Sequence, residues 1–241
     1  MTSYPIGSGL FTRKIGDPEW EHIISHQFAF VNEPDSLRKV GNVAYDIEVV
    51  ELEGDTTIWI PCWYGGLVRS NNWGEDWEQV IADDTTIFLP NLMSHRHFCF
   101  AADKNTTPPT LWTGTGEGIF KSTDSGDSWV QYTKADSITG NWVVAIGIQH
   151  IDDKSIVWAA TKTAEGSNEF NGLSYSEDFG ETWHYTGYEE RFDAWNFAFC
   201  DDIVYVSTST GLWKTIYPPE INYDTTIYVE DTLTGLVDTV D

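Results

Sequence analysis

Residues 118–129 read Gly-Ile-Phe-Lys-Ser-Thr-Asp-Ser-Gly-Asp-Ser-Trp, a short apolar phrase that runs directly into a polar turn. Variants of this phrase and turn occupy residues 66–77 and 172–183. All three turns fit the pattern S-x-[DN]-x-G-x-x-W, and they recur at intervals of roughly fifty residues, a typical length for one unit of a repeat protein. The turn positions that we expect to be structural are Ser70, Asn72, Gly74, Trp77, Ser122, Asp124, Gly126, Trp129, Ser176, Asp178, Gly180 and Trp183.

Each residue type in this turn has a physical reason to be there. An Asp or Asn at the third position can accept hydrogen bonds from backbone N–H groups of the turn, and Gly supplies the positive φ that closes it. The final Trp packs its ring under the hairpin and needs a partner for its N–H group. Because all of these roles serve folding, we expect Asp124 and Asp178 to be structural and not catalytic.

Short apolar segments precede each phrase at comparable places. They cover residues 45–49, 58–60, 98–102, 111–113, 142–148 and 157–159. Aromatic residues make up 15% of the chain, and their side chains suit the pleated, half-buried surface of a strand. Each unit therefore reads as four strands with the polar turn between the third and the fourth, which is the sequence signature of a propeller blade.

The three turns resemble the Asp-box, or BNR, repeat of sialidases, sortilin-type receptors, xyloglucan-degrading glycosidases and photosystem assembly factors. This resemblance implies an all-β fold, a β-propeller of four-stranded blades with Asp-box turns. It does not imply one activity, because enzymes, receptors and assembly factors share the motif, so the function has to be argued from a site.

Weaker copies of the phrase at residues 9–13 and 211–215 predict three full blades plus two partial ones. We expect a propeller over residues 1–216 and a tail, or the start of a further blade, over residues 217–241. The expected blades lie around residues 1–23, 42–80, 96–132, 141–185 and 193–216. Such an array is either a fragment of a larger propeller or a ring that the tail hairpin helps to close.

The charge of the chain limits its partners. Its 241 residues include 38 acidic and 13 basic side chains, a formal net charge of −25. This charge repels phosphate backbones and anionic lipid surfaces, so we do not expect nucleic acid as a partner. The chain has neither a bilayer-length apolar run nor a signal-like start, so we expect no membrane insertion. The expected partner is a protein or a glycan, and the family resemblance places the protein outside the cell or in the periplasm.

The cysteines and histidines give little sign of a metal or a disulfide. Cys62, Cys99 and Cys200 are an odd, widely spaced set in apolar segments, so we expect unpaired thiols. His95 and His97 lie two residues apart, and on a strand they would share a face and could bind a metal together. No motif with metal-ligand spacing accompanies them. We therefore expect neither a metal nor a cofactor, and the acidic clusters are expected to be solvated surface.

Propellers, by the same resemblance, bind ligands on the face opposite the Asp-box turns, where the connections between blades converge. The connections concerned are residues 24–42, 81–95, 133–141, 161–171 and 186–193. Candidate binding residues at or beside them are Arg38, Arg96, Arg191, Trp142 and Trp195. Guanidinium groups suit planar anions, and indole rings suit sugars, so the set points to an anionic protein or glycan ligand.

Two functions remain open on this basis. One is a non-catalytic binding or scaffolding propeller that uses its loop face, and the other is a glycoside hydrolase of the sialidase or xyloglucanase type. Three arginines would fit a sialidase, but no Tyr and Glu pair can be placed as nucleophile and base. A xyloglucanase needs two carboxyl groups across a cleft, and the candidate loops hold too many to choose from. These are Asp83, Asp84, Asp136, Glu189, Glu190 and Asp193.

Overall fold

The computed structural model describes residues 10–23, 43–52, 55–163, 170–187, 193–219, 227–230 and 237–240. The regular structure of these residues consists of antiparallel strands and a single 3-10 turn, η2 (Lys134–Asp136). Among them no helix has the length and apolar character needed to cross a membrane. The chain divides into two compact units, residues 1–133 with 141–143, and residues 134–140 with 144–241. The prediction of an all-β fold is confirmed.

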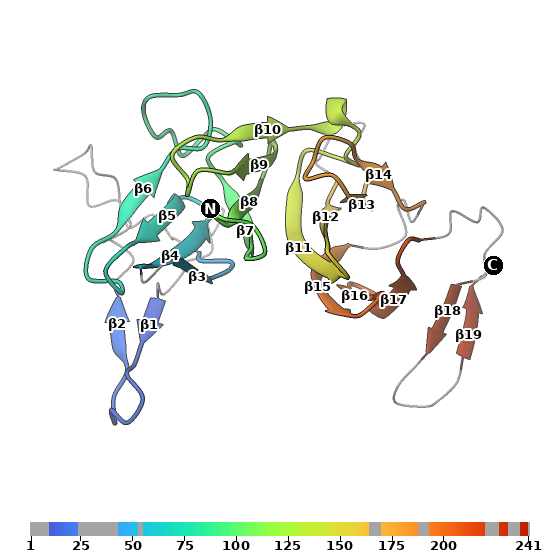
Figure 1. Cartoon of the computed structure of the whole chain (residues 1–241), viewed down its shortest axis with the longest axis horizontal. Coiled ribbons are helices and arrows are strands. Elements are labelled where there is room, and N and C mark those ends of the chain that lie inside the picture. Colours follow the sequence, from blue (N-terminus) through green and yellow to red (C-terminus); the bar gives the residue numbers. More distant parts are fainter. Residues whose placement is uncertain are drawn as a thin grey trace, which may run out of the picture. The chain divides into compact units, whose positions relative to one another are not determined.

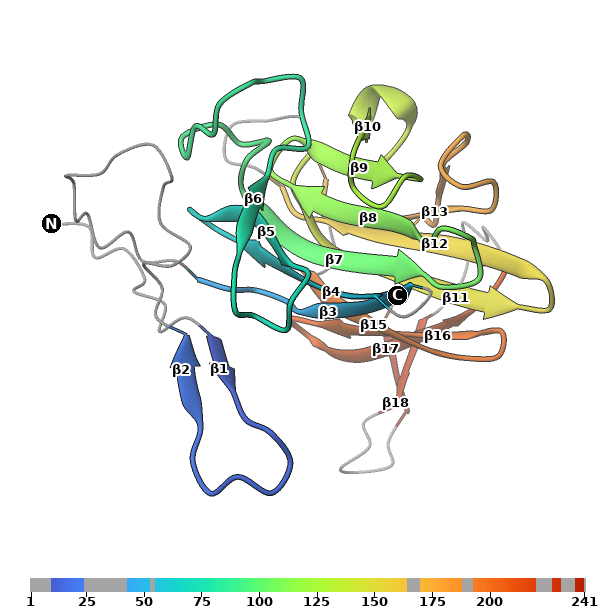
Figure 2. The same ribbon diagram turned by 60° about the vertical axis from the view of Figure 1, so that its left-hand side comes forward.

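The first unit holds two four-stranded sheets in which each strand pairs with the next along the chain (Figure 1). The first sheet consists of β3 (Glu48–Leu52), β4 (Asp55–Cys62), β5 (Gly66–Ser70) and β6 (Glu78–Val80). The second consists of β7 (His97–Asp103), β8 (Thr110–Thr115), β9 (Gly118–Ser122) and β10 (Val130–Tyr132), and Figure 2 shows β7, β8 and β9 edge to edge. A separate hairpin joins β1 (Leu10–Thr12) and β2 (Glu21–Ile23).

The second unit repeats the same plan. One four-stranded sheet consists of β11 (Val143–Ile151), β12 (Lys154–Thr161), β13 (Gly172–Ser176) and β14 (His184–Tyr185). A three-stranded sheet consists of β15 (Ala194–Cys200), β16 (Ile203–Thr208) and β17 (Gly211–Ile216). A terminal hairpin consists of β18 (Ile227–Glu230) and β19 (Val237–Val240). The predicted pattern of complete and partial four-stranded units is therefore present.

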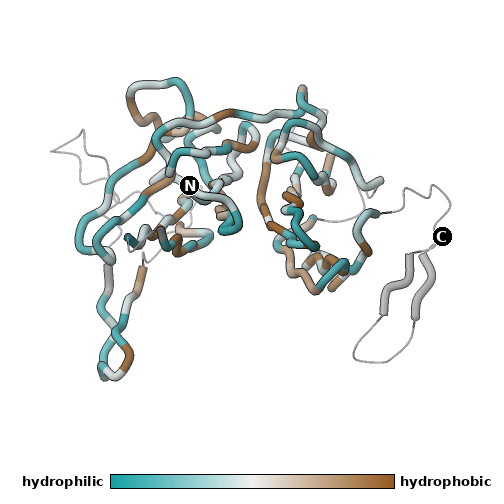
Figure 3. The backbone as a smooth tube through the Cα atoms, in the orientation of Figure 1, coloured by the Kyte–Doolittle hydropathy of each residue, from teal (hydrophilic) through white to brown (hydrophobic). Residues whose placement is uncertain are grey.

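Stacked aromatic side chains are part of the core of each unit. In the first unit the rings of Trp59 and Phe100 stack with centroids 5.0 Å apart, between β4 and β7. In the second unit Trp158 stacks on Tyr175 at 5.1 Å, and the Trp158 indole N–H donates to the buried Oε1 of Gln149. Figure 3 shows part of β11 in the brown of hydrophobic residues. Burial of both sheet faces explains why these strands read as apolar runs.

The first predicted strand of the first full unit is displaced. We expected it over residues 45–49, but β3 begins at Glu48, and Ala44 forms only an isolated bridge with Cys62. The backbone N–H of Tyr45 donates to the Pro61 carbonyl, and its ring lies 5.5 Å from that of Phe98. The segment before β3 is therefore held by one isolated bridge, by backbone hydrogen bonds and by the contacts of the Tyr45 ring, without a continuous strand.

Candidate binding site

The three polar turns share one hydrogen-bond pattern. In the turn after β9, the buried Ser122 Oγ accepts from the Gly126 N–H at 2.9 Å and donates to Asp124 Oδ1 at 2.8 Å. Asp124 Oδ1 also accepts from the Ser128 N–H at 2.9 Å. The same bonds recur in the other two turns. Ser70 and Asn72 accept from the N–H groups of Gly74 and Asp76, and Ser176 and Asp178 accept from those of Gly180 and Thr182. Each serine and each Asp or Asn side chain is thus bonded within its own turn.

The turn needs two left-handed residues, of which the sequence pattern indicated only one. Gly74, Gly126 and Gly180 have φ values near +90°. The residue before each glycine is also left-handed, although its side chain makes this costly. These residues are Trp73, Ser125 and Phe179, with φ of 61°, 62° and 57°.

Hydrogen bonds hold the acidic groups of the turns in their ionised form. The hydroxyl and backbone N–H of Ser128 lower the pKa of Asp124 to about 2. At Asp178 burial raises the pKa, but the hydrogen bonds from Thr182 and Ser176 outweigh burial and lower it. A carboxylate stabilised in this way is a poor proton donor. This geometry supports a structural role for both residues.

Replacing Ser122 by alanine should lower the free energy of unfolding by about 1 to 3 kcal/mol, because the Gly126 N–H would be left buried without an acceptor. Chemical denaturation of the purified variant measures this loss. Ser128→Ala is the comparison variant: its hydroxyl also bonds Asp124, but on the exposed side of the same turn, so its loss should be smaller. Equal losses for the two variants would contradict a specific role for the buried serine.

Arg96, in the connection between β6 and β7, lies against two aromatic rings. Its guanidinium carbon is 4.8 Å from the ring centroid of Trp63 and 5.1 Å from that of Tyr64. Its Nε donates to the Pro90 carbonyl at 3.3 Å. Among the described residues no carboxylate pairs with this guanidinium. Arg96 is thus held in place while its terminal nitrogens have no anionic partner in the described part of the chain.

Further aromatic rings pack around Trp63, all within the first unit. The centroid of Trp63 lies 5.4 Å from that of Phe98, 6.0 Å from that of Trp142 and 6.4 Å from that of Tyr45. We name the group the arginine–aromatic cluster; its members are Tyr45, Trp63, Tyr64, Arg96, Phe98 and Trp142. These residues lie before β3, between β4 and β5, at or directly before the start of β7 and before β11. The sheets therefore bring together residues that are far apart in sequence.

The other predicted binding residues are Arg38, Arg191 and Trp195. Arg38 and Arg191 lie outside the described residues. Trp195, in β15 of the second unit, is 47% exposed, and Lys162 Nζ lies 4.8 Å from its ring centroid. Lys162 also pairs with Asp193 at 3.3 Å. Of the predicted set, Arg96 and Trp142 lie in the first unit, and each contacts the ring of Trp63.

His95 and His97 are held by hydrogen bonds inside the protein. The Leu89 N–H donates to His95 Nδ1 at 2.8 Å, so the proton of this ring is on Nε2, which lies 3.0 Å from Asp83 Oδ2. His97 Nδ1 bonds the Thr113 hydroxyl at 2.8 Å. No group of three potential ligands that could hold a metal is found among the described residues. Both side chains belong to the structural network beneath the cluster.

Asp83, one of the carboxyl groups considered for catalysis, is held as a carboxylate. Burial raises its pKa, but hydrogen bonds from Thr85, Ser94 and His95 outweigh burial and hold the pKa well below its usual value. Such a group cannot act as the general acid of a glycosidase near neutral pH. Asp84, Asp136 and Asp193 are also described, whereas Glu189 and Glu190 lie outside the described residues.

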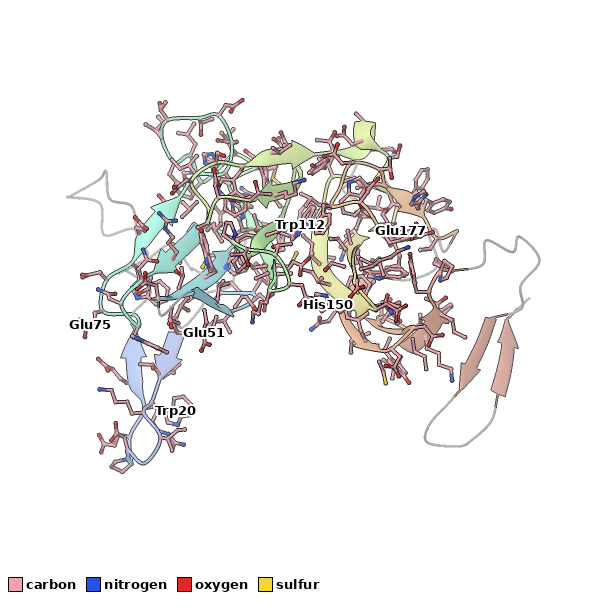
Figure 4. The ribbon with its side chains drawn as sticks, viewed as in Figure 1. Trp20, Glu51, Glu75, Trp112, His150 and Glu177 are labelled. Carbon is pink, nitrogen blue, oxygen red and sulfur yellow. The ribbon has the colours of Figure 1, made fainter. Side chains whose placement is uncertain are left out.

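The structure contains a Tyr–Glu pair that the sequence did not reveal. The hydroxyl of Tyr217 donates a hydrogen bond to Glu177, which is labelled in Figure 4. Burial, this bond and the negative charge of Glu177 raise the pKa of Tyr217 well above its usual range. A tyrosine nucleophile requires the opposite shift. Forty residues separate the partners, and no sequence pattern links them.

No protein-family model and no curated protein matches the chain. Solved structures do match it, and they show a β-propeller fold of four-stranded blades. PorZ, a bacterial surface component of the type-IX secretion system of Porphyromonas gingivalis, is 17% identical with a TM-score of 0.55 over 79% of this chain and 27% of its own. An ancestral GH74 enzyme is 18% identical with a TM-score of 0.50 over 72% and 23%.

The extracellular domain of a hybrid two-component system of B. thetaiotaomicron is 14% identical with a TM-score of 0.50, over 85% of this chain and 27% of its own. The chain thus spans about a quarter of the length of each of these proteins. At such low identity the similarity extends to the fold alone. The predicted propeller is confirmed, and its role has to be argued from the residues of this chain.

Proposed function

We propose that this protein is a non-catalytic binding propeller that recognises a carboxylate or sulfate group of a partner protein or glycan through the arginine–aromatic cluster. In this proposal the repeated turns are Asp-boxes that hold the blades together. The connections at the other end of the strands carry the ligand site. The family resemblance supports a place outside the cytoplasm, and so do the surface component and the extracellular domain among the similar structures.

The observation that carries the proposal is the state of Arg96. Two aromatic faces and one carbonyl fix its guanidinium, while none of the described carboxylates pairs with it. The chain carries a net charge of −25, yet this guanidinium is held by rings and a carbonyl and not by one of the described carboxylates. A guanidinium that is already held loses little side-chain entropy on binding, and its planar fork can bind a carboxylate or sulfate through two hydrogen bonds.

The hydrolase alternative is less well supported by the titratable groups. A glycosidase needs one carboxyl group that stays protonated near neutral pH, which requires a raised pKa. In the described part of the chain, the carboxyl groups whose pKa departs from its usual value are Asp83, Asp124 and Asp178. In all three the pKa is lowered. The pKa of Tyr217 is raised, which keeps the phenol protonated. These shifts favour a binding module over an enzyme.

Replacing Arg96 by alanine should weaken binding of an anionic ligand by about 1.5 to 3 kcal/mol, or roughly 10- to 150-fold. The full chain would be screened on arrays of sulfated, carboxylated and neutral glycans and against acidic peptides, and hits would be measured by calorimetry. Arg96→Lys keeps the positive charge but lacks the planar guanidinium, so its loss of binding affinity should be intermediate. Binding to the glycans but not to the peptides would indicate a glycan partner, and the reverse would indicate a protein partner.

Lys104→Ala is the control, because the exposed Lys104 already pairs with Glu48 and its removal should change binding little. The proposal fails if anionic ligands bind no better than neutral ones, or if Arg96→Ala binds as the parent does. Turnover of a fluorogenic sialoside that Arg96→Ala abolishes would instead establish the hydrolase alternative.

A further inference from the structure

A groove lies at the opposite end of β5 from the arginine–aromatic cluster. It has a volume of about 610 Å³ and lies between the β1–β2 hairpin and the polar turn at residues 70–77. Trp63 and Tyr64 precede β5, whereas this turn follows it, so the two sites lie at different ends of one strand. The volume falls within the range of about 300 to 1,000 Å³ that is usual for small-molecule sites.

Trp73 is an unusual residue for its position on the wall of this groove. Its φ is 61° and its side chain is 69% exposed. A left-handed backbone disfavours a large side chain, and Gly or Asn would adopt it at lower cost. Because the indole is mostly in water, burial of its surface compensates little for this strain. Fold stability therefore gives no reason for a tryptophan here, whereas a stacking surface for a ligand does.

Charges of both signs line the groove. The cations are Arg13 and Lys14, and neither pairs with a carboxylate among the described residues. The guanidinium carbon of Arg13 lies 4.9 Å from the ring centroid of Trp20, which fixes its position. The carboxylates are Asp17, Glu19, Glu21 and Glu75. Figure 4 labels Trp20 on the hairpin and Glu75 on the turn.

This mixture of charges narrows the class of ligand. The four carboxylates outnumber the two cations and would repel an anion, whereas Arg13 and Lys14 weaken the attraction of the groove for a cation. A neutral polyhydroxyl ligand meets neither penalty, because each of its hydroxyl groups can donate to a carboxylate and accept from a cation. Its apolar ring face can lie on an indole. The combination of Trp73 with both kinds of polar partner therefore fits a neutral saccharide.

We propose that the groove between the β1–β2 hairpin and the turn of Trp73 binds a neutral oligosaccharide. One sugar ring stacks on the indole of Trp73. Its hydroxyl groups donate to the carboxylates of Glu75 and of the hairpin, and accept from Arg13 and Lys14. This site is independent of Arg96 and of the anionic ligand assigned to the cluster.

Trp73→Asn tests the proposal, because asparagine tolerates the left-handed backbone but offers no ring. The full chain would be titrated with neutral β- and α-linked gluco- and xylo-oligosaccharides, and tryptophan fluorescence and calorimetry would report binding. We expect Trp73→Asn to bind about tenfold more weakly or worse while its melting temperature stays equal or rises. Phe179→Asn is the matched control, since it relieves the same backbone strain in another turn, and it should bind as the parent does.

Three outcomes would overturn the assignment. In the first, no neutral oligosaccharide binds the parent chain. In the second, Trp73→Asn binds as tightly as the parent. In the third, saccharide binding survives Trp73→Asn but is lost in Arg96→Ala, which would assign the saccharide to the arginine–aromatic cluster. A saccharide that Trp73→Asn loses and Arg96→Ala keeps would support this proposal, whatever the fate of the anionic ligand.

Discussion

An alanine at position 118 should lower the free energy of unfolding by about 3 to 5 kcal/mol. Gly118 begins β9 with φ at 117°, a backbone conformation that side chains rarely adopt, and an added Cβ would lie 2.2 Å from the Tyr132 carbonyl oxygen. That oxygen belongs to the backbone, so β10 itself would have to move. The Gly118 N–H also donates to the Asn141 carbonyl, directly before Trp142. We therefore expect the variant to lose the arginine–aromatic cluster along with stability, as chemical denaturation and ligand titration would show.

Gly211→Ala is a control that separates the cost of backbone strain from the cost of a steric clash. Gly211 opens the corresponding phrase at β17 with φ at 125°, but an added Cβ there would meet no atom within 4 Å. This control should lose only the cost of the strained backbone, about 1 to 2 kcal/mol. If both variants lose the same amount, the contact with Tyr132 contributes nothing and the explanation given for Gly118 is wrong.

The fold was predictable because the repeated turn is a local signal. Serine, an acid or amide, glycine and tryptophan each act within a few residues of one another, so the pattern S-x-[DN]-x-G-x-x-W determines the turn without knowledge of the rest of the chain. The second left-handed residue was missed, because Trp73, Ser125 and Phe179 share no chemistry that marks it. The displaced start of β3 was missed for another reason, since the segment before it pairs with the distant residues 61–63 only through an isolated bridge and two backbone hydrogen bonds.

The arginine–aromatic cluster was only partly predictable. The connections between blades were the expected place for a ligand, and Arg96 and Trp142 were among the candidates there. Sequence alone could not show how Arg96 is held, because that depends on the rings of Trp63 and Tyr64 against its guanidinium. Such contacts arise between connections that are far apart along the chain. No local pattern encodes them.

Acidification should destabilise the fold through His97 well before the carboxylates protonate. Burial, aided by the nearby His95, lowers the pKa of His97 to about 3. An unfolded chain binds a proton at this residue near pH 6.5, so between about pH 6.5 and pH 3 the unfolded state holds more protons than the folded state. Stability then falls as the pH falls, by about 1.4 kcal/mol per pH unit and about 3 kcal/mol by pH 4. Denaturation midpoints measured in small pH steps would show this slope.

His97→Asn identifies the residue responsible. The Thr113 hydroxyl donates to the Cys99 carbonyl, so it accepts from His97 Nδ1, and an asparagine amide can supply the same donor without titrating. The variant should be less stable at pH 7, because a fully buried ring is lost, but its stability should fall less steeply than that of the parent between pH 6.5 and pH 4.5. Asp83, Asp124 and Asp178 have lowered pKa values, so their contributions are lost only from about pH 4 downward. A variant whose stability falls in parallel with that of the parent across this window would show that His97 is not the group that titrates.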